Sequence, residues 1–362
     1  MLIFDSIFAL MNFQNEIINW YLVNKRDLPW RNTTDAYVIW LSEIILQQTR
    51  VEQGMPYFYK FLENFPTVVD FANASEQEVL KLWQGLGYYS RARNMLFTAK
   101  QVLTHHDGNF PKSYDVLIKL KGIGDYTAAA ISSFANNEAK AVVDGNVYRV
   151  LARYFGIQEP INSTVGKKIF AKLAQELIPN QQPAIYNQAA MEFGALQCKP
   201  KQPLCGTCPL QLGCYALANN LVDVLPIKLK KLKVKERFIN YFVANQEDII
   251  LTKKRNAGDV WQQMYDFPLI ETEAEVDGNE QEFVNEVRSF FGESAKIKLI
   301  SKKKHILTHQ IIYVQFFALE NYMINFNLHA EIKSVSYSQF EELPQPKVIN
   351  DFFEAYLKNK PK

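Results

Sequence analysis

The stretch LKGIGDYTA, Leu120–Ala128, decides the fold of the N-terminal part of the chain. Its two glycines, Gly122 and Gly124, permit a tight turn and a close approach of the backbone to another molecule. The turn opens onto a helix, whose free N–H groups at the N-terminus can bind a phosphate oxygen. With a hydrophobic residue before it and a helix after it, the stretch is typical of a helix-hairpin-helix over about residues 112–135, which binds the DNA backbone without reading its sequence. The same two glycines also occur in ordinary turns between helices, an alternative that the stretch alone leaves open.

On both sides of this stretch, the periodicity of apolar residues divides the chain into two parts. Residues 1 to about 218 are predicted to be mainly α-helical, and residues 236–355 are predicted to form a smaller α/β domain. Apolar residues recur at helical spacing in Val38–Val51, Val79–Leu86, Asn94–Leu103, Ala128–Phe134 and Val147–Phe155. The strands expected in the second part are Arg237–Ala244, Ile249–Thr252 and Ile311–Ala318, with a helix at Glu280–Phe291.

The two parts are joined by a basic segment, residues 219–235, which we predict to be a linker. Its lysines leave two interpretations open, a solvated connector and a segment that follows the DNA backbone. The basic residues in and just after this segment are Lys228, Lys230, Lys231, Lys233, Lys235 and Arg237.

The composition is that of a globular protein with two domains. The chain has 362 residues, of which 48% are hydrophobic and 22% charged, and its formal net charge is +2. This nearly neutral total neither requires nor excludes nucleic acid, because a local basic surface can lie within it. No run of about 18 apolar residues occurs, so we expect no membrane span. Because Met1–Phe13 lacks a basic leader and a small-residue cleavage site, we expect a helix there rather than a signal peptide, and a bacterial cytoplasmic setting.

All four cysteines lie in one short segment with the spacing Cys198-x6-Cys205-x2-Cys208-x5-Cys214. Thiols crowded in this way in a cytoplasmic protein indicate metal binding more than disulfides. Zinc sites usually combine two CxxC-like pairs, whereas this segment contains one. A compact loop can surround an iron–sulfur cubane, in which each of the four irons takes one thiolate. The spacing therefore favours an iron–sulfur cluster and leaves zinc or unligated thiols as alternatives.

Two acids, Glu43 and Asp144, have neighbours that predict different protonation states. The helical neighbours of Glu43 are mostly apolar, which predicts a raised pKa, as a general acid requires near neutral pH. Asp144 precedes an apolar helical pattern, and a helix N-terminus there lowers the pKa and keeps the carboxylate ionised. One protonated acid and one charged acid are the division of labour of glycosidic bond cleavage. Taken singly, the two residues are also typical of an exposed helical glutamate and an ordinary N-cap.

Together these segments resemble the MutY family of adenine DNA glycosylases, within the endonuclease III superfamily. The resemblance covers nearly all of residues 15–215, in order, and this joint match is far more specific than any single motif. It implies that the four cysteines bind a [4Fe–4S] cluster. The segments that carry the resemblance are Leu28–Arg31, Trp40–Glu43, Gln47–Thr49, Trp83–Tyr89, the hairpin, Val143–Val147 and the four cysteines.

The resemblance implies a role for each site residue. Glu43 would protonate adenine at N7, and Asp144 would stabilise the sugar cation or trap it covalently. Asn146 would help to hold the site, Tyr126 would sit beside the sugar, and water would finish the hydrolysis. The other implied contacts are those of Gln48 and Tyr88 as wedges in the duplex, Thr49 and Leu86 on the opposite oxidised guanine, and Arg31 and Gln188 as walls of the adenine pocket.

Tyr126 distinguishes this chain from its relatives that cut the strand. Endonuclease III-like enzymes have a lysine at this hairpin position, which forms a Schiff base, and a phenol cannot replace that amine. We therefore expect a monofunctional glycosylase, a monomer that acts on double-stranded DNA containing adenine opposite 8-oxoguanine or guanine. Two alternatives are a bifunctional glycosylase/lyase and a non-catalytic DNA-binding protein that uses the hairpin and the cysteine loop only for docking.

The C-terminal part resembles the Nudix-like domain that MutY proteins use to read 8-oxoguanine, in its segment from Trp261 to Leu269. Its candidate helix, Glu280–Phe291, lacks the Arg-Glu-x-x-Glu-Glu run that holds magnesium in Nudix hydrolases, so we expect recognition without hydrolysis. Where the family has a Phe-Ser-His loop, this chain has Leu307-Thr308-His309. Thr308 keeps a hydroxyl that can contact the oxidised base, together with His309, but the leucine departs from the family pattern. A Thr-His pair at a strand edge with no ligand is the alternative.

Overall fold

The computed structural model describes residues 2–229, 234–244, 248–323 and 331–358 of the chain. These residues form two compact units. The first, called here the helical unit, comprises Met1–Asn73 and Phe97–Lys230, and the second, the sheet unit, comprises Ala74–Leu96 and Lys231–Lys362. Three lysines of the expected basic linker, Lys230, Lys231 and Lys233, lie outside the described residues. No helix among the described residues is long and apolar enough to cross a membrane.

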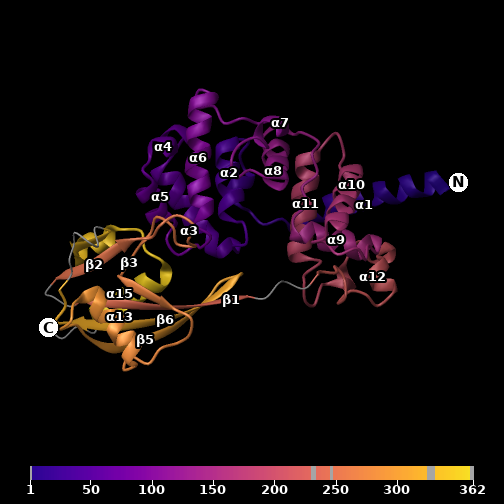
Figure 1. Ribbon diagram of the computed structural model, residues 1–362. Helices are drawn as coiled ribbons and strands as arrows, with labels where there is room; N and C mark the ends of the chain where they lie inside the picture. The colour runs from indigo at the N-terminus through magenta and orange to yellow at the C-terminus, as the bar shows by residue number, and fades with distance from the viewer. Residues whose placement is uncertain (1, 230–233, 245–247, 324–330, 359–362) are drawn as a thin grey trace. The chain divides into compact units, whose positions relative to one another are not determined.

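The helical unit has the α-helical character that the periodicity predicts (Figure 1). Its core lies between α1, α9 and α11, where Phe13, Ile17 and Tyr21 pack with residues such as Val150 and Phe193. The helices with most of their length in this unit are α1 (Leu2–Asn24), α2 (Ala36–Ile45), α3 (Val51–Asn64), α4 (Val68–Asn73), α6 (Ser90–His105), α7 (Tyr114–Leu117), α8 (Asp125–Asn136), α9 (Gly145–Phe155), α10 (Thr164–Leu177), α11 (Pro183–Leu196) and α12 (Tyr215–Ala218).

One predicted helix of this unit is wrong in its extent. The apolar pattern of Val38–Val51 predicts a single helix, whereas α2 ends at Ile45 and α3 begins at Val51. The residues between them form a turn in which Gln48 has a φ of 57°. A left-handed residue interrupts helical geometry whatever the apolar spacing is. The turn brings Gln48 and Thr49 to the wall of the cavity described below.

The hairpin forms between α7 and α8, as its two glycines predict. Gly122 has a φ of 78°, which favours glycine at this position. Gly124 is the N-cap of α8 and has extended backbone geometry, with open space where a Cβ would lie. Leu120 and Ile123 are buried and anchor the turn. The N-terminus of α8, with Asp125 and Tyr126 in its first turn, is thereby fixed.

The sheet unit contains two β-sheets and its own helices (Figure 1). The four-stranded sheet has the order β4-β1-β6-β5, with β1 and β6 parallel and the outer pairs antiparallel, and the three-stranded sheet has the order β3-β2-β7. The strands are β1 (Lys235–Ala244), β2 (Ile249–Lys254), β3 (Tyr265–Asp266), β4 (Leu269–Thr272), β5 (Lys296–Ile306), β6 (Gln310–Glu320) and β7 (Ile332–Ser336). The helices are α5 (Glu76–Trp83), α13 (Gln281–Phe291), α14 (Tyr337–Glu342) and α15 (Lys347–Lys358).

Helices cover both faces of the four-stranded sheet. On one face, Phe317 of β6 packs with Phe283 of α13. On the other face, Phe316 stacks on Phe352 of α15 with ring centroids 3.8 Å apart. Successive β6 residues therefore bury their rings in opposite layers, as the alternation of a strand requires. The predicted strands at 237–244, 249–252 and 311–318 and the helix at 280–291 are confirmed.

The segment Ala74–Leu96 belongs to the sheet unit, although it lies far away in sequence. Its helix α5 begins at a capping box on Ser75. Gln84 just after α5 is held by two hydrogen bonds: its Nε2 donates to Asn350 Oδ1 at 2.6 Å, and its Oε1 accepts from the backbone N–H of Gln345 at 2.9 Å. The apolar pattern of the sequence does not indicate this grouping, because it depends on polar contacts.

Candidate active site

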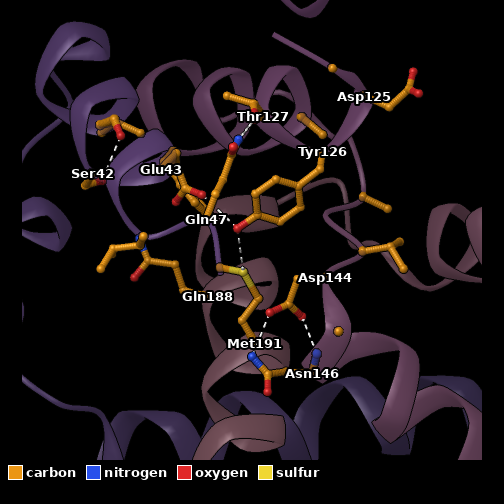
Figure 2. A pocket seen from close by; sticks show the side chains of 18 of the residues that line it. Ser42, Glu43, Gln47, Asp125, Tyr126, Thr127, Asp144, Asn146, Gln188 and Met191 are labelled. Atoms are coloured by element: carbon orange, nitrogen blue, oxygen red, sulfur yellow. Dashed lines mark hydrogen bonds between the residues drawn. The ribbon is translucent and has the colours of Figure 1, made fainter. Parts of the chain in front are cut away.

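A cavity of about 1140 Å³ lies within the helical unit. Glu43 reaches it from α2, Tyr126 from the first turn of α8, and Asp144 from the N-cap of α9 (Figure 2). The sequence thus places these three side chains in one space through three separate helices. Of the predicted site residues, the structure places the following in the lining: Arg31, Glu43, Gln48, Thr49, Gly124, Tyr126, Asp144, Asn146 and Gln188.

Glu43 has the environment of a general acid. Burial raises the pKa of its carboxyl group to about 7, and the nearby charge of Asp144 adds to the rise. A hydrogen bond from the Tyr126 hydroxyl to Glu43 Oε2, 2.7 Å long, and the charge of Arg31 act in the opposite direction. The predicted raised pKa is confirmed. A carboxyl group with this pKa is still partly protonated near neutral pH and can give up its proton there.

Asp144 is the N-cap of α9, as predicted, but the expected shift of its pKa is wrong in direction. Its Oδ1 accepts hydrogen bonds from the backbone N–H groups of Asn146 and Val147 at 2.8 and 2.7 Å, and its Oδ2 accepts from Asn146 Nδ2 at 2.6 Å. Burial raises the pKa of Asp144, and these hydrogen bonds and Arg149 lower it without cancelling the rise. The helix N-terminus alone predicts a lowered pKa, because the sequence does not reveal how deeply the carboxylate is buried.

The hydrogen bonds nevertheless separate the two acids. Among the described residues, Asp144 accepts three hydrogen bonds from fixed N–H donors, whereas Glu43 accepts one from a hydroxyl. N–H donors aimed at both carboxylate oxygens favour the anion of Asp144. Burial raises the pKa of both carboxyl groups, but the anion of Asp144 is stabilised by more hydrogen bonds than the anion of Glu43.

Asn146 is held in place from behind by buried groups. Its Oδ1 accepts a hydrogen bond from Arg149 Nη2 at 2.9 Å, and the same nitrogen donates to the backbone carbonyl of Gly194 at 2.6 Å. Arg149 also donates from Nε to the carbonyl of Cys198 at 2.7 Å. Because Nδ2 of Asn146 faces Asp144, the amide orientation is fixed at both ends.

The close approach of α11 to Asn146 requires a glycine at position 194. A Cβ on Gly194 would lie 2.6 Å from the Asn146 Cβ and 2.8 Å from its backbone oxygen. We expect Gly194→Ala to lower the free energy of unfolding by about 1–3 kcal/mol, because backbone cannot move aside as a side chain can. Denaturant unfolding followed by circular dichroism measures the change. Gly145→Ala is the control, since a Cβ there meets nothing within 4 Å, and equal losses for both variants would contradict the packing argument.

Tyr126 links Glu43 to the opposite wall of the cavity. Its hydroxyl donates to Glu43 Oε2 and lies 3.8 Å from the sulfur of Met191 on α11 (Figure 2). A second hydrogen bond joins α8 to the residues after α2 and runs from Gln47 Nε2 to Thr127 Oγ1, at 3.4 Å. The phenol therefore orients one oxygen of the acid and leaves Oε1 of Glu43 for a ligand.

The sequence patterns do not single out Glu192 of α11, which the structure places in the cavity lining. Its carboxylate is almost completely buried and forms paired hydrogen bonds with Arg26 and with Arg31, the latter at 3.1 and 2.8 Å. Although burial raises the pKa of Glu192, the hydrogen bonds from the two arginines lower it to about 2. Glu192 thus fixes the guanidinium of Arg31 at the cavity wall. Its spacing of four residues from Gln188 on a helix is the signal that could have identified it.

Four other predicted DNA contacts, Leu86, Tyr88, Thr308 and His309, belong to the sheet unit, whereas Gly122 lies in the hairpin of the helical unit. The hydroxyls of Tyr88 and Thr308 contact each other, which joins the segment after α5 to the turn between β5 and β6. His309 in the same turn is exposed. Leu86 is 6% exposed, so its side chain packs within the unit, and its backbone N–H donates to the carbonyl of Trp83 at 3.1 Å.

The four cysteines follow α11 in a segment with two short 3₁₀ helices, Cys205–Thr207 and Gln211–Gly213. All four are of intermediate exposure, and none forms a disulfide. The buried guanidinium of Arg153 donates from Nη1 to Cys198 Sγ at 3.3 Å and to the carbonyl of Lys199 at 2.8 Å. Among the described residues, no three Cys, His, Asp or Glu side chains are gathered closely enough to hold a single metal ion.

Comparisons with known proteins identify both parts of the chain. The family model for HhH-GPD superfamily base excision DNA repair proteins matches residues 41–179, and that for the NUDIX domain matches residues 240–355. The chain is 35% identical to the adenine DNA glycosylase of Buchnera aphidicola subsp. Baizongia pistaciae (strain Bp) over 305 residues, which cover 83% of this chain and 84% of that protein. It is 41% identical to the adenine DNA glycosylase of Homo sapiens over 223 residues, which cover 59% of this chain and 41% of that protein.

Solved structures confirm the fold of the helical part. A thermostable thymine-DNA glycosylase matches with a TM-score of 0.55 and 29% identity, covering 59% of this chain and 99% of that one. A trapped endonuclease III–DNA covalent intermediate matches with a TM-score of 0.51 and 22% identity, over 57% of this chain and 95% of that one. At this identity the match supports a shared fold and nothing more. With the curated relatives, these matches confirm the resemblance stated from the motifs. The chain therefore belongs to the MutY family of adenine DNA glycosylases and is a base-excision-repair DNA glycosylase.

Proposed function

We propose that the protein hydrolyses the N-glycosidic bond of adenine paired with 8-oxoguanine or guanine in double-stranded DNA. The observation that carries the proposal is one cavity that contains Glu43, with a pKa raised to about 7, and Asp144, whose carboxylate accepts three hydrogen bonds. Breaking this bond requires a proton on the leaving base and a negative charge beside the sugar cation. The two acids supply these in one space.

We assign the chemical steps to four residues. Glu43 gives its proton to N7 of adenine, so that the base leaves as a neutral molecule. Asp144 stabilises the positive charge that develops on the sugar, or traps it as a covalent ester, before water attacks. Asn146 holds Asp144 in place through its 2.6 Å hydrogen bond, and Tyr126 sits beside the sugar and orients Glu43.

The adenine must leave the base stack to reach this cavity, which costs a few kcal/mol. We assign the wedges that offset this cost to Gln48, in the turn after α2, and to Tyr88, which is 39% exposed. Thr49 and the backbone at Leu86 contact the opposite guanine. The hairpin holds the DNA backbone through Gly122 and Gly124, because the N-terminus of α8 offers N–H groups to a phosphate.

Recognition of the oxidised guanine is assigned to the C-terminal domain, with proposed limits of 236–355 after the linker 219–235 and the helical region 1–218. The match of residues 240–355 to the NUDIX domain supports this assignment. The hydroxyl of Thr308 is the group we expect at the altered edge of the base, with His309 beside it. The contact between Thr308 and Tyr88 supports this, because it places the reading turn next to a wedge residue.

We propose that the four cysteines hold a [4Fe–4S] cluster, which stiffens the loop and carries no step of the hydrolysis. The donor set fits: four thiols lie in one loop beside the buried cation of Arg153, which balances thiolate charge. A zinc ion needs all four sulfurs within about 2.3 Å of one point, whereas a cubane binds each thiolate through a separate iron. The segment has one CxxC pair, whereas zinc sites usually combine two, and this spacing favours the cluster.

The cluster can be tested by iron and sulfide analysis of the purified protein. We expect a brown protein with about four irons and four sulfides per chain. Cys208→Ser is expected to lose most of this content and to unfold at a lower temperature. Colourless protein containing one zinc ion per chain would contradict the assignment.

The proposed function is tested by a single-turnover assay on a duplex with adenine opposite 8-oxoguanine. We expect free adenine and an intact abasic strand, which breaks only after alkali treatment, since Tyr126 cannot form a Schiff base. Spontaneous nicking at the same rate as base release would instead indicate a bifunctional enzyme. Tight binding without any base release would indicate a DNA-binding protein. We also propose that the enzyme acts as a monomer in the bacterial cytoplasm, on DNA of the nucleoid.

A further inference from the structure

The hydroxyl of Tyr21 lies 2.6 Å from Oε1 of Gln188, a residue of the cavity wall. Tyr21 comes from the last turns of α1 and Gln188 from α11, so the bond joins two helices that are 167 positions apart at this point. Tyr21 is 5% exposed and does not line the cavity. Its hydroxyl therefore reaches the cavity through Gln188, while its ring contacts a second wall residue, Arg31.

The geometry of this bond sets which end of the Gln188 amide faces the cavity. A phenol has one proton to donate, and within the described part of the chain Gln188 Oε1 is the one acceptor that the Tyr21 hydroxyl reaches. A buried hydroxyl that does not donate loses free energy, so the carbonyl of the amide is drawn towards Tyr21. The Nε2 group of Gln188, which carries two N–H donors, is then the end left for a ligand.

Tyr21 is itself held in a single position. Its ring packs in the core between α1, α9 and α11, and the guanidinium of Arg31 lies over it, 5.8 Å from the ring centroid. Arg31 is fixed in turn by the buried carboxylate of Glu192. Glu192 follows Gln188 by four residues on α11, so the same face of this helix holds both Tyr21, through Gln188, and Arg31, through Glu192. Arg31 also has only donors to offer a ligand.

We propose that Tyr21 is a positioning residue that fixes the Gln188 amide with its N–H donors towards the flipped base. This inference rests on the proposed function and deepens it, because it names the hydrogen-bonding pattern of the base that Gln188 and Arg31 accept. Donors from Gln188 and Arg31 require an unprotonated ring nitrogen on the base edge that faces them. Adenine offers such a nitrogen at N1. N1 of guanine carries a hydrogen, so its N–H would face the N–H donors of Gln188 and Arg31 without an acceptor between them. A site with unpaired buried polar groups rejects its ligand strongly.

A double-mutant cycle tests the inference in the intact protein. Adenine release opposite 8-oxoguanine is measured under single-turnover conditions for wild type, Tyr21→Phe, Gln188→Leu and the double variant. We expect Tyr21→Phe to slow release about threefold to tenfold, the effect of one hydrogen bond. Once Gln188 is replaced, removing the Tyr21 hydroxyl should have no further effect, so the double variant should match Gln188→Leu.

Two further measurements separate positioning from a general loss of structure. Tyr21→Phe should bind a duplex with an abasic-site analogue as tightly as wild type does, because that duplex has no base for Gln188 to contact. Tyr37→Phe is the matched control: it is a buried tyrosine whose hydroxyl donates to the carbonyl of Phe65 at 2.6 Å, away from the cavity. If Tyr37→Phe slows adenine release, its fold-change and that of Gln188→Leu should multiply in the variant that carries both substitutions.

The inference is overturned if the losses from Tyr21→Phe and Gln188→Leu multiply, or if Tyr21→Phe releases adenine at the wild-type rate. It is also overturned if Tyr21→Phe weakens abasic-duplex binding as much as it slows release. These outcomes, with wild type still releasing adenine, leave the proposed function intact. Wild type that releases no adenine would overturn both.

Discussion

Glu43→Gln is expected to slow adenine release by about 10²–10⁴-fold under single-turnover conditions, the range contributed by a general acid. The amide keeps the size of the side chain and can still accept the hydrogen bond from Tyr126, so the cavity keeps its shape. It has no proton acidic enough to transfer to the base. Binding of the mispaired duplex should change little, because the substitution removes a proton transfer and not a contact with the DNA backbone.

An exposed glutamate provides the control for this substitution. Glu63 lies on α3, next along the chain from the helix that carries Glu43, and points to solvent. Glu63→Gln removes the same charge without entering the cavity and should release adenine at the wild-type rate. If Glu43→Gln and Glu63→Gln release adenine equally fast, Glu43 is not the acid.

Asp144→Asn is expected to slow adenine release by about 10²–10³-fold, the effect of removing one preorganised electrostatic group from an active site. The carboxylate is the group in the cavity that the backbone N–H groups of α9 hold as an anion. An amide at this position has no charge to stabilise the sugar cation. Its Nδ2 would also face the donor of Asn146, so we expect a small loss of stability in addition.

A second N-cap aspartate separates the chemical effect from the loss of a helix cap. Asp35 caps α2, accepting a hydrogen bond from the backbone N–H of Tyr37 at 2.8 Å, and it does not line the cavity. Asparagine caps a helix about as well as aspartate does, so Asp35→Asn should keep both stability and activity. Comparable loss of activity in both variants would show that capping, and not charge, is what Asp144 contributes.

Much of the fold could be predicted from the sequence, because the relevant signals are local. The glycines at 122 and 124 specify the hairpin, and helical or alternating apolar spacing specifies most helices and strands. The two acids were also identifiable, since each stands in a distinctive motif. The helix break at 46–50 was not, because the apolar spacing continues through the turn and the positive φ of Gln48 leaves no compositional trace.

The parts of the site that the sequence did not reveal depend on contacts between distant segments. Glu192 is an unremarkable glutamate in a helical pattern until the fold brings Arg26 and Arg31 to it. Tyr21 looks like an apolar position of α1, and only the approach of α11 gives its hydroxyl a partner. The predicted direction of the Asp144 pKa shift was wrong for the same reason. Burial is a property of the packed fold, and it raises the pKa by more than the helix terminus lowers it.

The pH dependence of single-turnover adenine release is the most direct test of Glu43 as the proton donor beside an anionic Asp144. Burial raises the pKa of Glu43 to about 7, so the protonated, active form predominates below that pH and is lost above it. We expect a rate that is level just below pH 7, falls about tenfold per unit well above it, and falls again at lower pH as Asp144 becomes protonated, with Glu43→Gln slow and lacking the fall above pH 7. A wild-type rate that stays constant through this range, or the same fall in Glu43→Gln, would contradict the account.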